Sequence, residues 1–367
     1  MATSTIACPR DAAQVAALLD SPEISGLISE LEATRWTGRP GYPLREMIGL
    51  ALVKSLYTLP TWTRAVALVK DHAGLRDALG AAPSADAAYR FTVKLREHAG
   101  MLAACTDRVL SGLHSMRPEM GATVAIDGSD LSAYANGQRY VKRGGELRKR
   151  FADPDATWGH RSSISTRSGG GYYGYKVHCA VDTATGLPLA WQVRTAKDPE
   201  VAEVAGLLDS VMERGFAAQV AVLDRGYDSG ALYDLLESRG IRPAIPLRQT
   251  PAVKAGKDKP PSCEHGTWTF AGSDARRGAS KWRCPSRECQ PASVWVKASR
   301  LHPLIPRESQ RYKSLYCQRG AVEREFGRLK NEWGALPLRV RRMFRVRLHV
   351  DLTILAQLAS ALLIARA

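Results

Sequence analysis

The order of strand-like and helix-like segments after residue 121 limits the possible folds of this chain more than any other feature of its sequence. ATVAID, YYGYKVHCAVD and LPLAWQVRTA have the composition of strands, and the turn TATG joins the last two as a hairpin. A helical segment (PEVAEVAGLLDSVMERG), a strand (AAQVAVLD), a second helix (SGALYDLLESRG) and a last strand (IRPAIPL) follow. This order predicts an α/β fold in which helices flank a mixed sheet, and one more helix is needed to cover that sheet.

The first part of the chain has a different pattern. Residues 1–118 contain short helical segments that begin at Pro43 or at the capping residues Thr61 and Ser84, so we predict an all-helical N-terminal domain. Helices of this length joined by short turns fit a helix-turn-helix type of DNA binder, although most small helical domains bind no DNA. The remaining predicted boundaries are 119–249 for the first part of the α/β domain, 250–304 for an insertion and 305–367 for two helices that complete the domain.

The positive charge of the chain indicates a polyanionic partner. Its 52 Lys and Arg exceed its 36 Asp and Glu, which gives a net charge of +16. Solubility is one explanation of such charge, but its distribution is uneven. Residues 311–347 hold 11 Lys or Arg against three Asp or Glu, and residues 139–150 hold six against one. Two separated basic tracts fit a long path for a phosphate backbone, and nucleic acid is the commonest partner of this kind.

Three carboxylates lie on predicted core elements. Asp127 and Asp224 are each predicted at the end of an apolar strand with a glycine within the next two residues, and Glu323 lies on the helix predicted to cover the sheet. A single aspartate at a strand end often does no more than cap a turn. Three such carboxylates brought together would repel one another unless cations lay between them. Oxygen ligands of this kind favour Mg²⁺ or Mn²⁺, and a pair of ions about 4 Å apart supports phosphoryl displacement.

The helix predicted over residues 316–330 has a polar stripe beside an apolar one. At about 100° per residue, its polar residues Tyr316, Arg319, Glu323 and Lys330 share one narrow face. Glu325 falls beyond the apolar stripe, where we expect a surface ion pair with Arg328. A structural ion pair between Arg319 and Glu323 would explain the polar stripe as well as a functional site would.

The spacing Tyr316-x2-Arg319-x3-Glu323-x6-Lys330 resembles the signature of one branch of the bacterial insertion-sequence transposases with an Asp-Asp-Glu (DDE) centre. AIDGSD around Asp127, AVLDRGYDS around Asp224, YGYKVHCAVD, and GRPGYPLREMIGLALVKSLY near the N-terminus are also similar to this family. The resemblance covers essentially the whole chain. It implies a ribonuclease-H-like catalytic domain that is interrupted by an insertion and preceded by a helical DNA-binding domain.

The resemblance also implies a reaction and a role for each residue of the signature. Asp127, Asp224 and Glu323 would hold Mg²⁺ or Mn²⁺, as two ions, and Arg319 and Lys330 would contact DNA phosphates. Tyr316 would position the terminal nucleotides. Hydrolysis at the element's end would free a 3′-hydroxyl that then attacks target DNA, and the enzyme would act as a homodimer on double-stranded DNA. Two other functions stay open, namely a simple metal-dependent nuclease of the same fold and a catalytically silent DNA-binding protein.

The insertion contains a second possible metal site. Cys263 and His265 precede Cys284 and Cys289, and these four soft ligands could close a tetrahedral zinc site in a segment with little core of its own. Neither of these two ligand pairs has the tight C-x2-C spacing of a zinc knuckle. The alternative to a zinc site is that the cysteines are reduced and only pack in the core. The nearby tryptophans are predicted to form a small core rather than a base-stacking platform, and they are Trp268, Trp282 and Trp295.

Two further segments carry predictions. Residues 160–176 mix Ser, Gly and basic residues without periodicity, so we predict a solvated connector. The apolar run at 352–365 contains Gln357 and is too short to span a membrane, so we predict a buried closing helix. The N-terminal residues lack the pattern of a signal peptide, and we therefore expect a cytoplasmic protein with no membrane partner.

Overall fold

The N-terminal part of the structure is helical. The computed structural model describes residues 11–34, 41–137, 151–161 and 168–367. Its first helices are α1 (Ala12–Asp20), α2 (Pro22–Ala33), α3 (Leu44–Leu56), α4 (Trp62–Asp71), α5 (Ala73–Leu79), α6 (Ala85–Glu97) and α7 (Ala99–Met116). Two predicted caps are confirmed, since Thr61 Oγ1 accepts a hydrogen bond from the Arg64 amide at 3.3 Å and Ser84 Oγ accepts one from the Ala87 amide at 3.1 Å.

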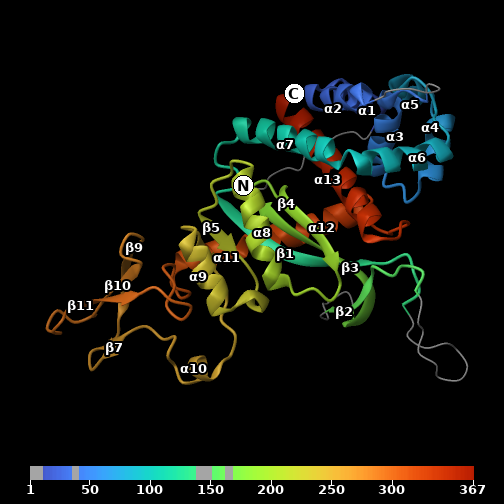
Figure 1. The fold of residues 1–367 in the computed structure, drawn as a ribbon. Coiled ribbons are helices and arrows are strands. Elements are labelled where there is room, and N and C mark those ends of the chain that lie inside the picture. The colour runs from blue at the N-terminus through green and yellow to red at the C-terminus, as the bar shows by residue number, and fades with distance from the viewer. Residues whose placement is uncertain (1–10, 35–40, 138–150, 162–167) are drawn as a thin grey trace, which may run out of the picture.

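A mixed sheet lies below these helices in Figure 1. Its strands are β1 (Thr123–Ser132), β2 (Thr157–Arg161), β3 (Gly170–Asp182), β4 (Pro188–Thr195), β5 (Val220–Val222) and β6 (Arg242–Ala244). β1 pairs antiparallel with β3 and parallel with β5, and β5 pairs parallel with β6. β2 and β4 both pair antiparallel with β3, along different parts of its length. The mixed sheet and the hairpin predicted from the sequence, here β3 and β4, are therefore confirmed.

The two helices predicted between the strands are also present. α8 (Glu200–Glu213) connects β4 to β5 and packs on β4 and β3, while α9 (Gly230–Ser238) connects β5 to β6. In the β3–β4 turn, Gly186 has a φ of +69°, a conformation that glycine adopts at little cost. The strands and helices thus follow the order read from the sequence, with β5 and β6 shorter than their apolar runs.

Part of the segment predicted as a solvated connector is strand, and its residues 172–176 were also included in the predicted strand YYGYKVHCAVD. β2 includes His160 and Arg161, and β3 begins at Gly170 and pairs with β2 from its first residue. The prediction failed because glycines and serines hide the period-2 pattern of a strand, whereas backbone pairing with β3 needs no apolar side chain. Residues 162–167 and the basic tract at 139–150 lie outside the described residues.

The insertion forms a small lobe that projects from the sheet, at the left of Figure 1. It contains α10 (Pro251–Lys254) and two separate small sheets. One consists of β7 (Ser262–Cys263) and β8 (Gly266–Thr267), and the other of β9 (Thr269–Asp274), β10 (Ala279–Arg283) and β11 (Ser293–Lys297). None of these strands pairs with the central sheet in the described part of the chain.

The helix predicted over residues 316–330 is two helices. α11 (Gln310–Cys317) ends before Gln318, and α12 (Gly320–Asn331) begins after Arg319. Thr183 Oγ1 donates a hydrogen bond of 2.7 Å to Gln318 Oε1 at this break, and Gly320 follows it. Tyr316 therefore belongs to a different helix from Glu323 and Lys330, and Arg319 lies at the break between the two helices. α12 packs on β1 and β3 and covers the sheet as predicted.

The last helix, α13 (Met343–Arg366), joins the two parts of the molecule. It packs against α7 and α3 on one side and against β4 on the other, so that one hydrophobic core runs from the N-terminal helices into the sheet. Its length and composition would allow it to cross a membrane, but most of its apolar stretch is buried inside the protein. The predicted burial of residues 352–365 is confirmed for their central part, which includes Gln357.

Candidate catalytic site

Strand pairing places Asp127 and Asp224 beside each other. In the parallel pair of β1 and β5, Ala125 lies opposite Val222. Asp127 is two residues beyond Ala125, and Asp224 is two residues beyond Val222. The two strands therefore place their carboxylates at the same level of the sheet. Asp127 was predicted at a strand end, which is wrong, because β1 continues to Ser132 as the partner of β3. Asp224 does follow directly after β5.

Each aspartate accepts a hydrogen bond from a nearby glycine amide. Asp127 Oδ1 accepts from the Gly128 amide at 2.8 Å, and Asp224 Oδ1 accepts from the Gly226 amide at 2.6 Å. A Cβ atom at Gly226 would lie 2.7 Å from Asp224 Oδ1, and one at Gly128 would lie 2.9 Å from the ring of His178 on β3. Glycine at position 226 therefore lets the backbone approach the Asp224 carboxylate, and glycine at position 128 leaves room for the His178 ring.

Arg319 connects the third carboxylate to the first. Its Nη2 atom lies 2.5 Å from Glu323 Oε1, and its Nη1 atom lies 3.4 Å from Asp127 Oδ2. Glu323 is on the first turn of α12 with its side chain 57% exposed, which leaves it accessible to a ligand. The arginine therefore holds Glu323 close to Asp127.

Burial and neighbouring carboxylates both disfavour charge at Asp127. The pKa of Asp127 is raised to about 7, chiefly by burial and also by the nearby Asp224 and Glu200, although the Gly128 amide and Arg319 act to lower it. Glu200, at the start of α8, pairs with Lys176 on β3 at 2.7 Å. A cluster of this kind is stabilised by positive charge placed among its oxygens, which is the property expected of a divalent cation site.

Two members of this cluster were not identified from the sequence. Glu200 follows Pro199 at the start of a predicted helix, but only the packing of α8 against the sheet brings it to Asp127. Tyr227 lies in the turn after Asp224 and is buried, and burial together with Asp127, Glu200 and Asp224 raises its pKa well above the ordinary value. The sequence signal that could have identified this tyrosine is its place in the AVLDRGYDS segment, close after Asp224.

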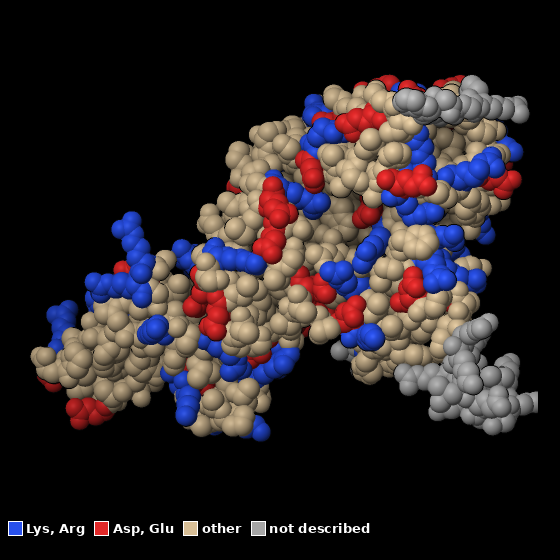
Figure 2. All heavy atoms as spheres, viewed as in Figure 1, with Lys and Arg blue, Asp and Glu red and all other residues tan. Residues whose placement is uncertain are grey.

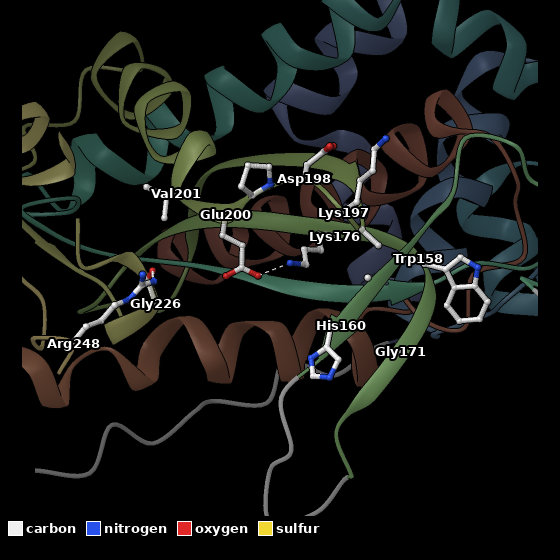
Figure 3. Close-up of a pocket in the computed structure, with 13 residues that line it drawn as sticks. Trp158, His160, Gly171, Lys176, Lys197, Asp198, Glu200, Val201, Gly226 and Arg248 are labelled. Atoms are coloured by element: carbon white, nitrogen blue, oxygen red, sulfur yellow. Dashed lines mark hydrogen bonds and ion pairs between the residues drawn. The ribbon is translucent and has the colours of Figure 1, made fainter. Parts of the chain in front are cut away.

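A cavity of about 800 Å³ opens beside the carboxylates (Figure 3). Glu200, which lies near Asp127, and Gly226, whose amide donates to Asp224, line this cavity, and Figure 3 shows the ion pair between Glu200 and Lys176. Other basic and aromatic side chains complete the lining, namely Trp158, His160, Lys197 and Arg248. The cavity thus combines an acidic wall with cations that could hold a phosphate backbone.

The other residues of the predicted signature contact protein groups in this structure. Lys330 Nζ donates to Ser129 Oγ at 2.8 Å and lies 3.6 Å from Asp130 Oδ1, both on β1. Tyr316 stacks on Tyr312 with ring centroids 5.8 Å apart, next to a small apolar cluster under β5 and β6. Arg319 and Lys330 therefore lie at the edge of the carboxylate cluster, while Tyr316 lies on α11 beyond the helix break.

Glu325 is buried, which corrects the prediction of a surface ion pair. Its carboxylate is fully buried, lies 2.6 Å from Arg328 Nη2 and accepts a hydrogen bond of 3.0 Å from Gln357 on α13. The ion pair with Arg328 is present, but α13 covers the side of α12 that the helical pattern assigned to solvent. Glu325 therefore takes part in the packing of α12 against α13.

A second basic region lies where the N-terminal helices meet α13. A cavity of about 480 Å³ is lined there by Lys54, Arg90, Arg96, Arg339, Arg341 and Arg345 together with Trp62, Tyr89 and Tyr134. Figure 2 shows Lys and Arg side chains gathered on this face of the molecule. Three of these arginines belong to the basic tract at 311–347, and no carboxylate lines the cavity among the described residues.

The four residues predicted as zinc ligands lie together in the insertion. The ligand atoms of Cys263, His265, Cys284 and Cys289 are all within 4.8 Å of one another. Trp268 and Trp282 pack with Cys284 and Cys289 in the small core of the lobe, while Trp295 is 43% exposed. The prediction of a tryptophan core thus holds for two of the three residues.

Comparison with known proteins identifies a family and a similar solved structure. Residues 119–358 match the family model described as "Transposase DDE domain". The chain is similar to the protein in the "Cryo-EM structure of piggyBac transposase synaptic complex with hairpin DNA (SNHP)", with 14% identity and a TM-score of 0.45 over 97% of this chain and 75% of that chain. No curated protein matches the chain.

Proposed function

The chain belongs to the family of transposases with a DDE domain, and we propose that it is the transposase of a bacterial insertion sequence, which binds the ends of its element and catalyses metal-dependent cleavage and transfer of DNA strands. The observation that carries this proposal is the pairing of β1 with β5, which places Asp127 and Asp224 side by side, with Glu323 joined to Asp127 through Arg319. The mixed sheet with carboxylates on adjacent strands also supports a ribonuclease-H-like catalytic domain, interrupted by the insertion.

Asp127, Asp224 and Glu323 would hold two Mg²⁺ or Mn²⁺ ions. The donor set fits, because it consists of carboxylate oxygens, and the raised pKa of Asp127 reflects a buried negative charge that lacks compensation. When bound, the ions supply activation of a water molecule and stabilisation of the attacking and leaving oxygens. Arg319 occupies the space between Asp127 and Glu323 in this structure, and we propose that it turns to a DNA phosphate when the cations bind.

The first step in the proposed reaction is hydrolysis of a phosphodiester bond at the element's end, which leaves a 3′-hydroxyl and a 5′-phosphate. In the second step, this hydroxyl attacks a phosphodiester of the target, forming a new ester and releasing a target 3′-hydroxyl. Lys176 and Arg248 line the cavity beside the carboxylates, where they would orient the scissile strand. Both steps are in-line displacements at phosphorus, so one arrangement of side chains serves both.

The DNA is proposed to run from the carboxylates to the second basic cavity, at the base of the N-terminal helices. Lys and Arg contacts there give affinity without reading sequence, so the N-terminal helices are the proposed readers of the element's ends. Lys330 would hold a phosphate near the cut, and Tyr316 would position the terminal nucleotides. Two ends must be processed together, so we propose a homodimer assembled on DNA in the cytoplasm, without a membrane partner.

We expect Arg319→Ala and Lys330→Ala to weaken DNA binding and to make it less sensitive to salt. Each lost phosphate contact should lower the slope of log K against log [salt] by about one. Fluorescence anisotropy of an element-end duplex across a KCl series measures this slope. Arg324→Ala, on the exposed side of α12, is the matched control. An unchanged slope would assign Arg319 and Lys330 to their carboxylate contacts with Glu323 and Asp130 instead of to DNA.

A metal-dependent nuclease of the same fold is the alternative enzyme, and a silent DNA-binding protein is the alternative without catalysis. Incubation of the protein with cleaved element ends and a target plasmid separates the two enzymes. Joined products, seen as a shift of labelled ends to plasmid size, support the transposase. Cleaved ends that are never joined would favour the nuclease. The presence of all three carboxylates argues against the silent protein.

A further inference from the structure

The lobe formed by residues 250–304 has a very small hydrophobic core. Its cluster of buried residues consists of Trp268, Trp282, Cys284 and Cys289, with Cys263, Val294 and Val296 partly buried against it. A segment of this size with so little buried apolar surface usually needs a disulfide or a metal ion to hold its structure. Two of the four core residues are cysteines, and a third cysteine contacts them.

The distances from Cys263 Sγ to the other three ligand atoms match those around a tetrahedral ion, and all four atoms lie within 4.8 Å of one another. Cys263 Sγ lies 3.5 Å from Cys284 Sγ, 3.8 Å from Cys289 Sγ and 3.8 Å from His265 Nδ1. With bonds of about 2.3 Å to sulfur and about 2.0 Å to nitrogen, ligands at tetrahedral angles lie roughly 3.5 to 3.8 Å apart. A disulfide would require sulfurs about 2.05 Å apart, so the cysteines are arranged for an ion and not for a bond between them.

We propose that the lobe binds one Zn²⁺ through Cys263, His265, Cys284 and Cys289. Three thiolates and one imidazole are soft ligands that select zinc over the Mg²⁺ or Mn²⁺ of the carboxylate cluster, so the two metal sites are chemically distinct. All four positions are filled by protein ligands, which is the composition of a structural site without an open position for a substrate. The Ser286 amide donates to Cys284 Sγ at 3.4 Å, which helps to orient that sulfur.

The four ligands come from segments that are otherwise weakly connected. Cys263 is on β7 and His265 is in the turn before β8, whereas Cys284 follows β10 and Cys289 is in the loop before β11. A bound ion would tie the β7–β8 hairpin to the three-stranded sheet, and these two sheets share no strand pairing. The bound ion would therefore cross-link the two small sheets of the lobe.

A separate anchor holds the base of the lobe to the catalytic domain. Arg300 pairs with the buried carboxylate of Asp228 at 2.5 Å, in the turn that follows Asp224, and Arg307 Nε donates to Ile245 O at 2.9 Å. These contacts involve no zinc ligand. Loss of the ion should therefore unfold the lobe and leave the sheet with Asp127 and Asp224 folded.

The test is the metal content of the purified full-length protein, measured by inductively coupled plasma mass spectrometry. We expect one zinc per chain in the wild type and at least a tenfold lower content in Cys263→Ala, Cys284→Ala and His265→Ala. Cys317→Ala removes an exposed thiol on α11 and should retain one zinc. Protein loaded with Co²⁺ should show the visible absorption of a tetrahedral thiolate site, and the three ligand variants should not.

Three results would overturn the proposal. The first is wild-type protein without zinc even after addition of Zn²⁺ under reducing conditions. The second is zinc retained in the ligand variants. The third is a thiol titration of the denatured, unreduced protein that finds two thiols fewer than the sequence contains, which would indicate a disulfide. After removal of zinc, limited proteolysis should cut only within residues 250–304. Simultaneous cleavage within β1 or β5 would contradict the claim that the ion stabilises the lobe alone. None of these results depends on transposase activity.

Discussion

Replacing Glu323 by glutamine should abolish strand cleavage and leave DNA binding intact, whereas replacing Glu325 by glutamine should preserve most cleavage. Glu323 is exposed beside Asp127, while Glu325 is buried against α13. The glutamine at 323 keeps the size of the side chain and removes the charge that a cation requires, so we expect a rate at least about 10²-fold lower. Cleavage of labelled element-end duplexes under single-turnover conditions measures the difference.

The two variants control for each other, because they make the same chemical change two residues apart on one helix. Binding of each variant to the same duplex, measured without divalent cations, shows whether the DNA-binding surface is intact. Equal loss of cleavage in both variants would contradict the assignment of the catalytic glutamate to position 323.

Arg328→Ala should clearly destabilise the fold. The variant would leave the Glu325 carboxylate buried, with Gln357 as its remaining partner. Breaking a buried pair in this way costs about 3 kcal/mol in the free energy of unfolding, at the lower end of the usual range since Arg328 is 28% exposed. Arg328 also donates to the Gly186 carbonyl in the β3–β4 turn, and that contact would be lost too.

The destabilisation should depend on pH. The pKa of Glu325 is raised to about 7, because the effect of burial outweighs the lowering by Arg328 and Gln357. A carboxyl whose pKa is higher in the folded state stabilises the fold when protonated, and this stabilisation is lost as the pH rises through about 7. Urea unfolding should therefore show a smaller effect of Arg328→Ala at about pH 5.5 than at about pH 8. Arg324→Ala should have little effect at either pH, and equal destabilisation of Arg328→Ala at both would contradict the buried charge.

Local sequence patterns predicted the elements of the fold well. Thr61 and Ser84 are caps because their hydroxyls satisfy nearby amides, which depends on only a few neighbouring residues. The β3–β4 hairpin and the strands leading to Asp127 and Asp224 were likewise visible in apolar runs and turn residues. Each of these features is decided by short-range chemistry, which the sequence displays directly.

The parts that were predicted wrongly depend on contacts between distant segments. Glu325 was assigned to the surface because a helical pattern shows only one apolar side, whereas the folded chain buries its carboxylate and pairs it with Gln357 of α13. Glu200 was missed because it comes close to Asp127 only through the packing of α8 on the sheet. At the break between α11 and α12, Gln318 accepts a hydrogen bond from Thr183, more than a hundred residues earlier, and local sequence patterns do not show this contact.

The most direct test of the central claim, that the carboxylates of β1, β5 and α12 form a metal centre that cuts DNA, is cleavage of a supercoiled plasmid carrying the element's own ends. Wild-type protein and Asp127→Asn are compared with Mg²⁺, with Mn²⁺ and with a chelator. We expect cuts at the element ends by the wild type with either ion, none with the chelator, and none by Asp127→Asn. Cleavage that persists in the variant or in the chelator, or specific end binding by the wild type without any cleavage, would contradict the claim.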